Sequence, residues 1–383
     1  MTEVSLLMME LIRSEIFGSE VKEEYRKPIS AEMGRALYTL SKAHDLSHVI
    51  ASALEKTPII EDAELIEKFK KSMHLAVYRY RMQNAEYNDL SEVLEAAEID
   101  YLPLKGSVIR SLYPTPWMRT SSDIDVLVRR EDLTRAETLL MTELEYERDS
   151  RSSHDVVLVA PSGVHVELHF DLVEDARLPS AAAILRSIFE RAEPERKGLH
   201  RYVMRDEDFY FYHIAHMAKH FDNGGCGIRP FIDLMLIGEQ NTEKRKELLS
   251  YGELLRFAES SLLLSEYWFC GADGSEMIEA FSSFVLSGGT YGTTKNSVAV
   301  KGSRKGKFGY IMSRLFLPFS TLKERYPILN KHPYLAPAMQ VKRWFGMIKG
   351  KRLGKSFGEL KENASLSNDT VERTAEMLRN IGL

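Results

Sequence analysis

Residues 123–128 read Asp-Ile-Asp-Val-Leu-Val, and this stretch decides the fold that the sequence predicts. Successive side chains of a β-strand point to opposite faces, so Asp123 and Asp125 share one face while the aliphatic side chains share the other. The stretch 164–170, Val-His-Val-Glu-Leu-His-Phe, alternates in the same way and carries Glu167 on its polar face. If the two strands are neighbours with their polar faces aligned, the three carboxylates converge.

Three adjacent carboxylates repel one another unless a cation neutralises them. Oxygen ligands without a thiolate favour Mg²⁺ or Mn²⁺. Two such ions about 3.5–4 Å apart can stabilise both the attacking and the leaving oxygen of a phosphoryl or nucleotidyl transfer. The sequence therefore predicts that Asp123, Asp125 and Glu167 bind divalent ions and organise phosphate chemistry. The alternative reading is a turn or helix-cap pair at a strand start, with Glu167 as an exposed strand residue.

A second candidate element lies upstream, in Leu104-Lys105-Gly106-Ser107. Here a short strand over 101–104 is expected to pass into one or two helical turns. Gly106 permits close backbone approach, and a helix start offers unpaired amide groups to a phosphate. We expect Lys105, Gly106 and Ser107 to bind phosphate, although a tight strand-to-helix connection would explain Gly106 and Ser107 without a ligand.

The same residues carry a family resemblance. In chain order they are Leu104-Lys105-Gly106-Ser107, Tyr113-Pro114, Arg119, Asp123-Ile124-Asp125-Val126-Leu127-Val128 and Val166-Glu167-Leu168-His169. A Gly-Ser turn, an Asp-x-Asp and a later strand carboxylate in this order resemble the polymerase-β-like nucleotidyltransferase superfamily. The sequence looks most like its uncharacterised bacterial branch, often called nucleotidyltransferase family 5, and the resemblance covers residues 95–175 best.

The resemblance implies an enzyme that moves a nucleoside monophosphate from a nucleoside triphosphate, with ATP favoured, to an acceptor hydroxyl and releases pyrophosphate. Asp123 and Asp125 would hold both metal ions. Glu167 would complete the second metal site and help to activate the acceptor hydroxyl. Gly106 and Ser107 would position the triphosphate. The acceptor stays open among a small molecule, a protein and an RNA end.

Three further cations are candidates for contact with the triphosphate. Arg119 ends the loop before the Asp-x-Asp, and Lys219 and Arg229 lie in the helical region that follows the sheet. A triphosphate carries several charges, which a bidentate guanidinium suits well. Solvated surface cations are the alternative for each of them.

Histidines form the last group of candidates. His213, His216 and His220 share one helical face, at a spacing that a mononuclear metal hydrolase could use, but packed or hydrogen-bonded histidines explain the pattern better. The residues that we expect around the site, supporting it rather than binding metal or phosphate, are His165, His169, His216, His220 and Asp233.

Composition excludes several classes of protein. The 383 residues carry 51 Lys and Arg against 56 Asp and Glu, so no global positive field attracts nucleic acid. Two cysteines are too few for a disulfide framework or a four-cysteine zinc site and suit a reducing compartment, so a cytoplasmic location is expected. The N-terminus lacks the basic start and apolar core of a signal peptide. The sequence contains no apolar run of about eighteen residues, so integral membrane association is not expected.

These patterns predict an α+β chain in which a small mixed sheet is flanked by N-terminal and C-terminal helical regions. Asp132 is expected to cap a helix over 133–140, and Pro-Ser-Gly at 161–163 to join a hairpin of 154–160 and 164–170. Later helices are expected over 206–222, 229–239, 245–270 and 275–286. The expected regions are an N-terminal helical region 1–98, a nucleotidyltransferase core 99–175, a helical domain 176–286 that closes the cleft, a flexible loop 287–308 and a helical tail 309–383.

The basic segment 339–355 of the tail contains Trp344 and Phe345 and no acid. It could bind RNA or an anionic membrane surface, but a solvated helix whose rings pack inward explains it better. Two other functions stay open. One is a glycosyltransferase, which also uses Asp-x-Asp to hold a metal and a nucleotide-sugar diphosphate. The other is a degenerate nucleotidyltransferase fold kept as a nucleotide sensor or scaffold. The sequence does not indicate the oligomeric state.

Overall fold

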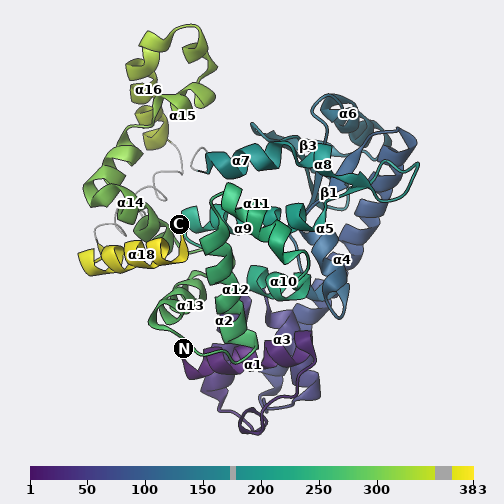
Figure 1. The fold of residues 1–383 in the computed structure, drawn as a ribbon, viewed down its shortest axis with the longest axis vertical. Coiled ribbons are helices and arrows are strands. Elements are labelled where there is room, and N and C mark those ends of the chain that lie inside the picture. Colours follow the sequence, from purple (N-terminus) through teal and green to yellow (C-terminus); the bar gives the residue numbers. More distant parts are fainter. Residues whose placement is uncertain (173–177, 350–364) are drawn as a thin grey trace.

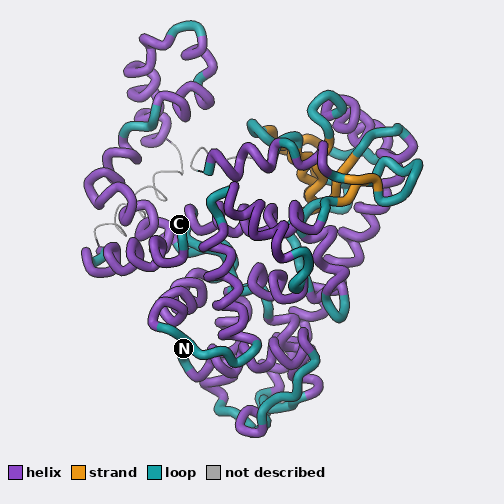
Figure 2. The backbone as a smooth tube through the Cα atoms, viewed as in Figure 1, coloured by secondary structure: helices purple, strands orange, loops and turns teal. Residues whose placement is uncertain are grey.

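The computed structural model describes residues 1–172, 178–349 and 365–383. Figure 1 shows helices around a small sheet, and Figure 2 shows that strand residues are confined to one side of the molecule. The architecture confirms the predicted α+β class. None of the helices within the described ranges is long and apolar enough to cross a bilayer.

The N-terminal region consists of helices. Ser30 precedes the second of them, and its hydroxyl accepts a hydrogen bond from the Met33 amide at 3.1 Å, as the sequence predicts for an N-cap. The fourth helix is 34 residues long and contacts both the other N-terminal helices and the sheet. The elements are α1 Glu3–Phe17, η1 Glu23–Tyr25, α2 Ala31–Ala43, α3 Ser47–Lys56 and α4 Ala63–Ala96.

The sheet has five strands in the order β1-β2-β5-β4-β3, and only the β2–β5 pair is parallel. Its strands are β1 Tyr101–Pro103, β2 Asp123–Val128, β3 Glu147–Arg151, β4 Asp155–Val159 and β5 His165–His169. The predicted β4–β5 hairpin is confirmed, and Gly163 takes a φ of +83° in its turn. Strand β3 is not predicted by the sequence, because its five residues, Glu-Arg-Asp-Ser-Arg, are all exposed and none is apolar.

The parallel pairing sets the two faces of the sheet. Asp125 pairs with Glu167 in register, so both side chains leave the same face. Ile124 and Val166, on the opposite face, are buried in a core formed with α4 and α6 Leu133–Glu143. Asp132 does not cap α6, contrary to prediction: its side chain accepts no bond from the first turn, because its backbone is already helical at φ −88° and ψ −10°.

Short elements join β1 to β2 and β5 to the helical region. They are α5 Gly106–Ile109, η2 Arg110–Leu112, η3 Pro116–Met118, α7 Pro179–Arg186, α8 Ile188–Arg191, β6 Glu193–Pro194 and β7 Tyr202–Val203. The larger helices that follow are α9 Asp206–Asp222, α10 Arg229–Ile237, α11 Thr242–Tyr251, α12 Leu255–Phe269 and α13 Glu276–Gly288. The single helix predicted over 245–270 is therefore two. The chain breaks at Gly252, whose Cα packs so close to the Phe211 ring that a Cβ would lie 2.3 Å from it.

The flexible loop predicted over 287–308 is wrong for most of its length, since α14 Thr294–Leu315 begins within it. The composition of this segment is typical of a loop, because Gly, Ser and Lys surround the buried run Val298–Val300. The Thr293 hydroxyl caps its first turn, and Gly306 kinks it at a φ of +68°. The remaining elements are α15 Phe319–Arg325, η4 Pro327–Asn330, η5 Pro333–Leu335, α16 Ala336–Lys349 and α18 Asn368–Ile381. The part of the predicted basic segment from residue 350 lies outside the described residues.

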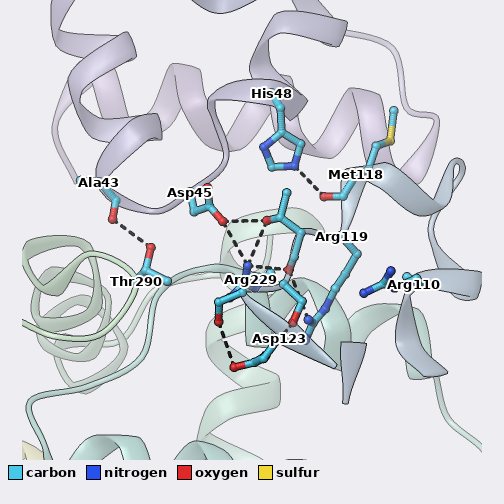
Figure 3. A network of polar contacts seen from close by, with 12 residues as sticks. Ala43, Asp45, His48, Arg110, Met118, Arg119, Asp123, Arg229 and Thr290 are labelled. Atoms are coloured by element: carbon cyan, nitrogen blue, oxygen red, sulfur yellow. Dashed lines mark hydrogen bonds and ion pairs between the residues drawn. The ribbon is translucent and has the colours of Figure 1, made fainter. Parts of the chain in front are cut away.

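Two loops that contain glycines pack closely against each other. Gly224, between α9 and α10, has a φ of +112°, and a Cβ there would lie 2.7 Å from the Ser297 backbone nitrogen. Gly292, between α13 and α14, has a φ of +76°, and its Cβ would lie 2.6 Å from the Gly224 backbone. Thr290 joins the same loops to α2, since its hydroxyl donates to the Ala43 carbonyl oxygen at 3.1 Å (Figure 3) and its amide donates to the same oxygen at 2.9 Å. Only glycine allows these backbones to approach so closely.

We predict that Gly224→Ala lowers the free energy of unfolding by ~3 kcal/mol, because the new methyl group adds a clash with fixed backbone to the strain of positive φ. Gly163→Ala is the matched control: its φ is +83°, but nothing lies within 4 Å of its Cβ position. That variant should lose only ~1 kcal/mol. Urea unfolding measures both, and equal losses would show that the loops do not interlock.

Candidate active site

The acidic residues of β2 and β5 meet two cationic side chains. The Asp125 carboxylate is 2% exposed, and its Oδ1 accepts hydrogen bonds from Lys105 Nζ at 2.6 Å and His169 Nε2 at 2.9 Å. His169 Nε2 also lies 3.3 Å from Glu167 Oε2. Both bonds to Asp125 go to one oxygen, so its Oδ2 takes part in neither.

The charges in this cluster shift one another's pKa values. Burial alone would raise the pKa of Asp125, but the Lys105 ammonium and the His169 hydrogen bond lower it below its ordinary range. Burial alone would lower the pKa of His169, yet its bonds to Asp125 and Glu167 raise it. Asp125 is therefore ionised at neutral pH, held by a neighbouring ammonium and an imidazole that favours its protonated form.

Three side chains offer ligand atoms that converge. One atom each from Asp125, Glu167 and His169 lies within 4.8 Å of the other two, an arrangement that could hold a metal ion. Asp123 lies outside this group, although it shares the face and the cleft. Its two oxygens accept hydrogen bonds at 3.0 Å from the Ser121 and Ser122 hydroxyls. Burial and the charge of Asp125 raise the pKa of Asp123.

The acids open into a cleft between the sheet and the helical region. The residues singled out from the sequence that line this cleft are Lys105, Arg119, Asp123, Asp125, Glu167, His213, His216, His220, Arg229 and Asp233. His169 and Lys219 line a smaller neighbouring cavity that shares Lys105 and His216 with the cleft. His165 is exposed at the start of β5.

A family model described as an uncharacterised nucleotidyltransferase matches residues 31–269. The chain belongs to this nucleotidyltransferase family. The match confirms the resemblance in the sequence and assigns the chain to an enzyme family. It runs from α2 to the end of α12, so it includes the acidic strands and most of the cleft, whereas α13 and the elements after it follow the matched range. A search of curated proteins finds no match.

In this nucleotidyltransferase the Gly-Ser turn has a steric explanation. Gly106 is buried, and a Cβ there would lie 3.0 Å from Arg119 Nη1 and 3.2 Å from Ser121 Oγ. The Ser107 amide donates to the Leu104 carbonyl oxygen at 3.1 Å. The preceding residue, Lys105, has a φ of +43° and a ψ of −115°, an uncommon conformation for a residue with a side chain. Its ammonium pairs with Asp125, so the turn presents Lys105 to the acids, and phosphate binding by Gly106 and Ser107 stays a prediction.

A buried ion pair joins the loop before β2 to helix α10. Arg119 Nη2 donates to Asp233 Oδ2 at 2.9 Å, and the Tyr113 hydroxyl donates to Asp233 Oδ1 at 2.7 Å. Burial alone would raise the pKa of Asp233, but Arg119 lowers it. A buried carboxylate and guanidinium stabilise a structure only when both are present, because either alone would be an unpaired buried charge. Arg119 is thus fixed at the wall of the cleft.

Arg229 is fixed close to Arg119, because a guanidinium nitrogen of each donates to the Thr120 carbonyl oxygen (Figure 3). Its Nη1 donates to the Thr120 carbonyl oxygen at 2.8 Å and lies 3.4 Å from Asp45 Oδ2. The Thr120 hydroxyl donates to the same Asp45 oxygen at 2.7 Å. The α2–α3 turn, the loop before β2 and the start of α10 therefore hold one another through these three residues.

The histidines of α9 are packed rather than clustered for a metal. His213 Nε2 donates to the Pro230 carbonyl oxygen at 3.0 Å, and the His216 ring lies edge-on to His220, with ring centroids 4.5 Å apart. Burial lowers the pKa of both His213 and His216, so both are neutral at pH 7. These contacts favour packed, hydrogen-bonded histidines over the metal site of a mononuclear hydrolase.

Several residues that line or build the cleft are not predicted by the sequence. Ser121 and Ser122 had one signal, a hydroxyl-rich run directly before the Asp-x-Asp. Asp45 and Tyr291 had none, because they come from turns remote in sequence from the acidic strands. His44, which also lines the cleft, donates from Nε2 to the Leu286 carbonyl oxygen at 3.1 Å.

Burial lowers the pKa of His44 to about 4. The unfolded chain binds this proton near pH 6.5 and the folded chain does not, so we predict that acidification from pH 7 to pH 5 lowers the free energy of unfolding by about 2 kcal/mol through this residue. His44→Gln should keep the hydrogen bond to Leu286 and lose this part of the pH dependence. Urea unfolding at both pH values measures the difference, and identical pH dependence in the two proteins would contradict the assignment.

Proposed function

We propose that the protein is a metal-dependent nucleotidyltransferase that transfers a nucleoside monophosphate from a nucleoside triphosphate to an acceptor hydroxyl. An acceptor oxygen would form a bond to the α-phosphorus while the bond from that phosphorus to the β-phosphate oxygen breaks, and pyrophosphate would leave. The observation that carries the proposal is the in-register pairing of Asp125 with Glu167 on parallel neighbouring strands, with Asp123 on the same face. These acids lie in a cleft that also contains Lys105, whose positive charge suits a negatively charged triphosphate.

The donor set fits hard divalent cations. Asp123, Asp125 and Glu167 supply carboxylate oxygens, which Mg²⁺ and Mn²⁺ prefer. Such ions, two of them by the resemblance, would supply charge neutralisation for the triphosphate and the leaving pyrophosphate. His169 is bonded to Asp125 and close to Glu167, so it would hold the two carboxylates in place. Glu167 is the candidate to accept the proton of the acceptor hydroxyl.

The triphosphate would lie among the cations of the cleft. Arg119 and Arg229 are each fixed by hydrogen bonds to other residues, and both reach the Thr120 carbonyl oxygen. Preorganised charges of this kind stabilise a charged transition state without the cost of ordering them during the reaction. Lys105 is already bonded to Asp125, so it is positioned to contact both that carboxylate and a phosphate. Lys219, at the neighbouring cavity, is a further candidate for such contact.

We predict that Asp125→Asn and Glu167→Gln each lower the rate of nucleotidyl transfer by ~10³-fold, because each removes charge that the metal ions need. Pyrophosphate release with Mg²⁺ and each nucleoside triphosphate measures the rate. Asp132→Asn is the matched control, since it changes a partly exposed aspartate four residues after the end of β2 without touching the cleft. Circular dichroism checks that every variant folds.

The same variants separate the rival functions. A glycosyltransferase that uses only the Asp-x-Asp would retain its activity in Glu167→Gln and lose it in Asp125→Asn. A nucleotide sensor would bind ATP and Mg²⁺ in calorimetry and release no pyrophosphate from any nucleotide. Either result would replace the proposed reaction.

The nucleotide and the acceptor can be found in one experiment. We expect label from ATP, more than from GTP, CTP or UTP, to appear on a component of cell extract when the protein and Mg²⁺ are present. Chelation by EDTA should abolish the transfer, and Mn²⁺ should restore it. Transfer that continues in EDTA would contradict metal dependence, and equal labelling from all four nucleotides would contradict the preference for ATP.

A further inference from the structure

Positive charge is concentrated in one part of the chain. Residues 294–349, here called the arm, carry 12 Lys and Arg and a single acid, Glu324. The remainder of the chain carries 39 Lys and Arg against 55 Asp and Glu. The arm comprises α14, α15, η4, η5 and α16, and Figure 1 shows α15 and α16 projecting away from the body of the molecule. The strongest contacts of α15, η4, η5 and α16 are with one another.

Helix α16 exposes two large apolar side chains and buries two polar ones, the reverse of what is usual for a helix in water. Val341 and Phe345, four residues apart on one face, are 43% and 62% exposed. Gln340 and Arg343 are 9% and 7% exposed, and Gln340 donates to the Leu317 carbonyl oxygen at 2.9 Å. A surface helix normally buries its apolar stripe and exposes its polar face. The outer face of α16 therefore fits surroundings that are less polar than water.

The other short elements of the arm also expose large apolar side chains. Phe319 of α15, Ile328 of η4 and Tyr334 of η5 are each about half exposed or more. Exposed cations lie beside them in the sequence, and these are Lys323, Arg325, Lys331 and Lys342. Apolar groups accompanied by Lys and Arg are the features with which a peripheral helix enters the headgroup region of an anionic bilayer.

We propose that the arm docks this protein on the surface of an anionic lipid bilayer. Charge complementarity attracts the arm, and the exposed apolar side chains of α16, η4 and η5 enter the headgroup boundary. A fluid lipid surface takes apolar groups from several short elements without a matching shape. A single-stranded nucleic acid would stack its bases on aromatic rings, but it provides no apolar surroundings for the aliphatic side chains of Ile328 and Val341. With 14 residues, α16 is long enough to lie in the interface and too short to span the bilayer.

Vesicle flotation with the purified full chain tests the proposal. We expect binding to vesicles of 70% phosphatidylcholine and 30% phosphatidylglycerol at 100 mM salt, and at least tenfold weaker binding to pure phosphatidylcholine. Val341→Ser combined with Phe345→Ser should weaken binding to the anionic vesicles about tenfold, as should Lys331→Glu combined with Lys342→Glu. The cleft residues are untouched, so nucleotidyl transfer should be unchanged in both variants.

Matched controls come from the exposed surface of α4. Leu75→Ser combined with Tyr78→Ser removes two exposed apolar side chains, and Lys70→Glu combined with Lys71→Glu reverses two exposed charges. Both controls should bind like the unaltered protein. Equal unfolding temperatures show that the arm variants are folded.

Several results would overturn the proposal. They are failure of the folded full chain to float with anionic vesicles, equal binding to neutral vesicles, and equal loss in the α4 controls. If the arm variants instead lose binding to a single-stranded RNA oligonucleotide while vesicles are ignored, the surface binds nucleic acid. If they convert a dimer to a monomer in sedimentation and vesicles are again ignored, the arm contacts a second copy of the chain.

Discussion

The parallel pairing of β2 with β5 is the constraint on which the site depends. It places Asp125 opposite Glu167 and puts Asp123 on the same face. Like charges so close would repel, and burial would neutralise Asp125, if Lys105 and His169 did not bond to the same oxygen. The positive-φ backbone of Lys105 presents its ammonium to Asp125, and the alternation of β5 places Glu167 and His169 on the same face. Negative charge is thereby concentrated where a divalent ion could bind.

The cleft above these acids is assembled from segments far apart in the sequence. Asp45 follows α2, Thr120 precedes β2, and Arg229 begins α10, yet the three are hydrogen-bonded to one another. The Arg119–Asp233 pair makes a second such connection. The interlocked loops at Gly224 and Gly292 adjoin Gly227 and Tyr291, which line the cleft. The helical regions therefore fix the position of the cations as much as the sheet fixes that of the acids.

Sequence reasoning succeeded where a pattern is local and failed where tertiary contacts decide. The alternation in 123–128 and 164–170 predicted both strands and their polar faces, because the period of a strand is visible in a few residues. The exposed strand β3 has no apolar residue to show such a period. Helix α14 depends on a few buried residues among Gly, Ser and Lys, so its composition indicated a loop. The bond between Lys105 and Asp125 joins the turn after β1 to β2, and nothing in either segment indicates it.

The central claim is that the carboxylates of β2 and β5 surround divalent ions. Crystals grown with Mn²⁺ and a non-hydrolysable ATP analogue would test it most directly, since the anomalous signal of manganese locates each ion without reference to any assay. The account predicts anomalous peaks within coordination distance of Asp125 and Glu167, with the triphosphate on the cleft side of the ions. Bound nucleotide with manganese away from Glu167, or a Glu167 carboxylate turned from Asp125, would contradict it.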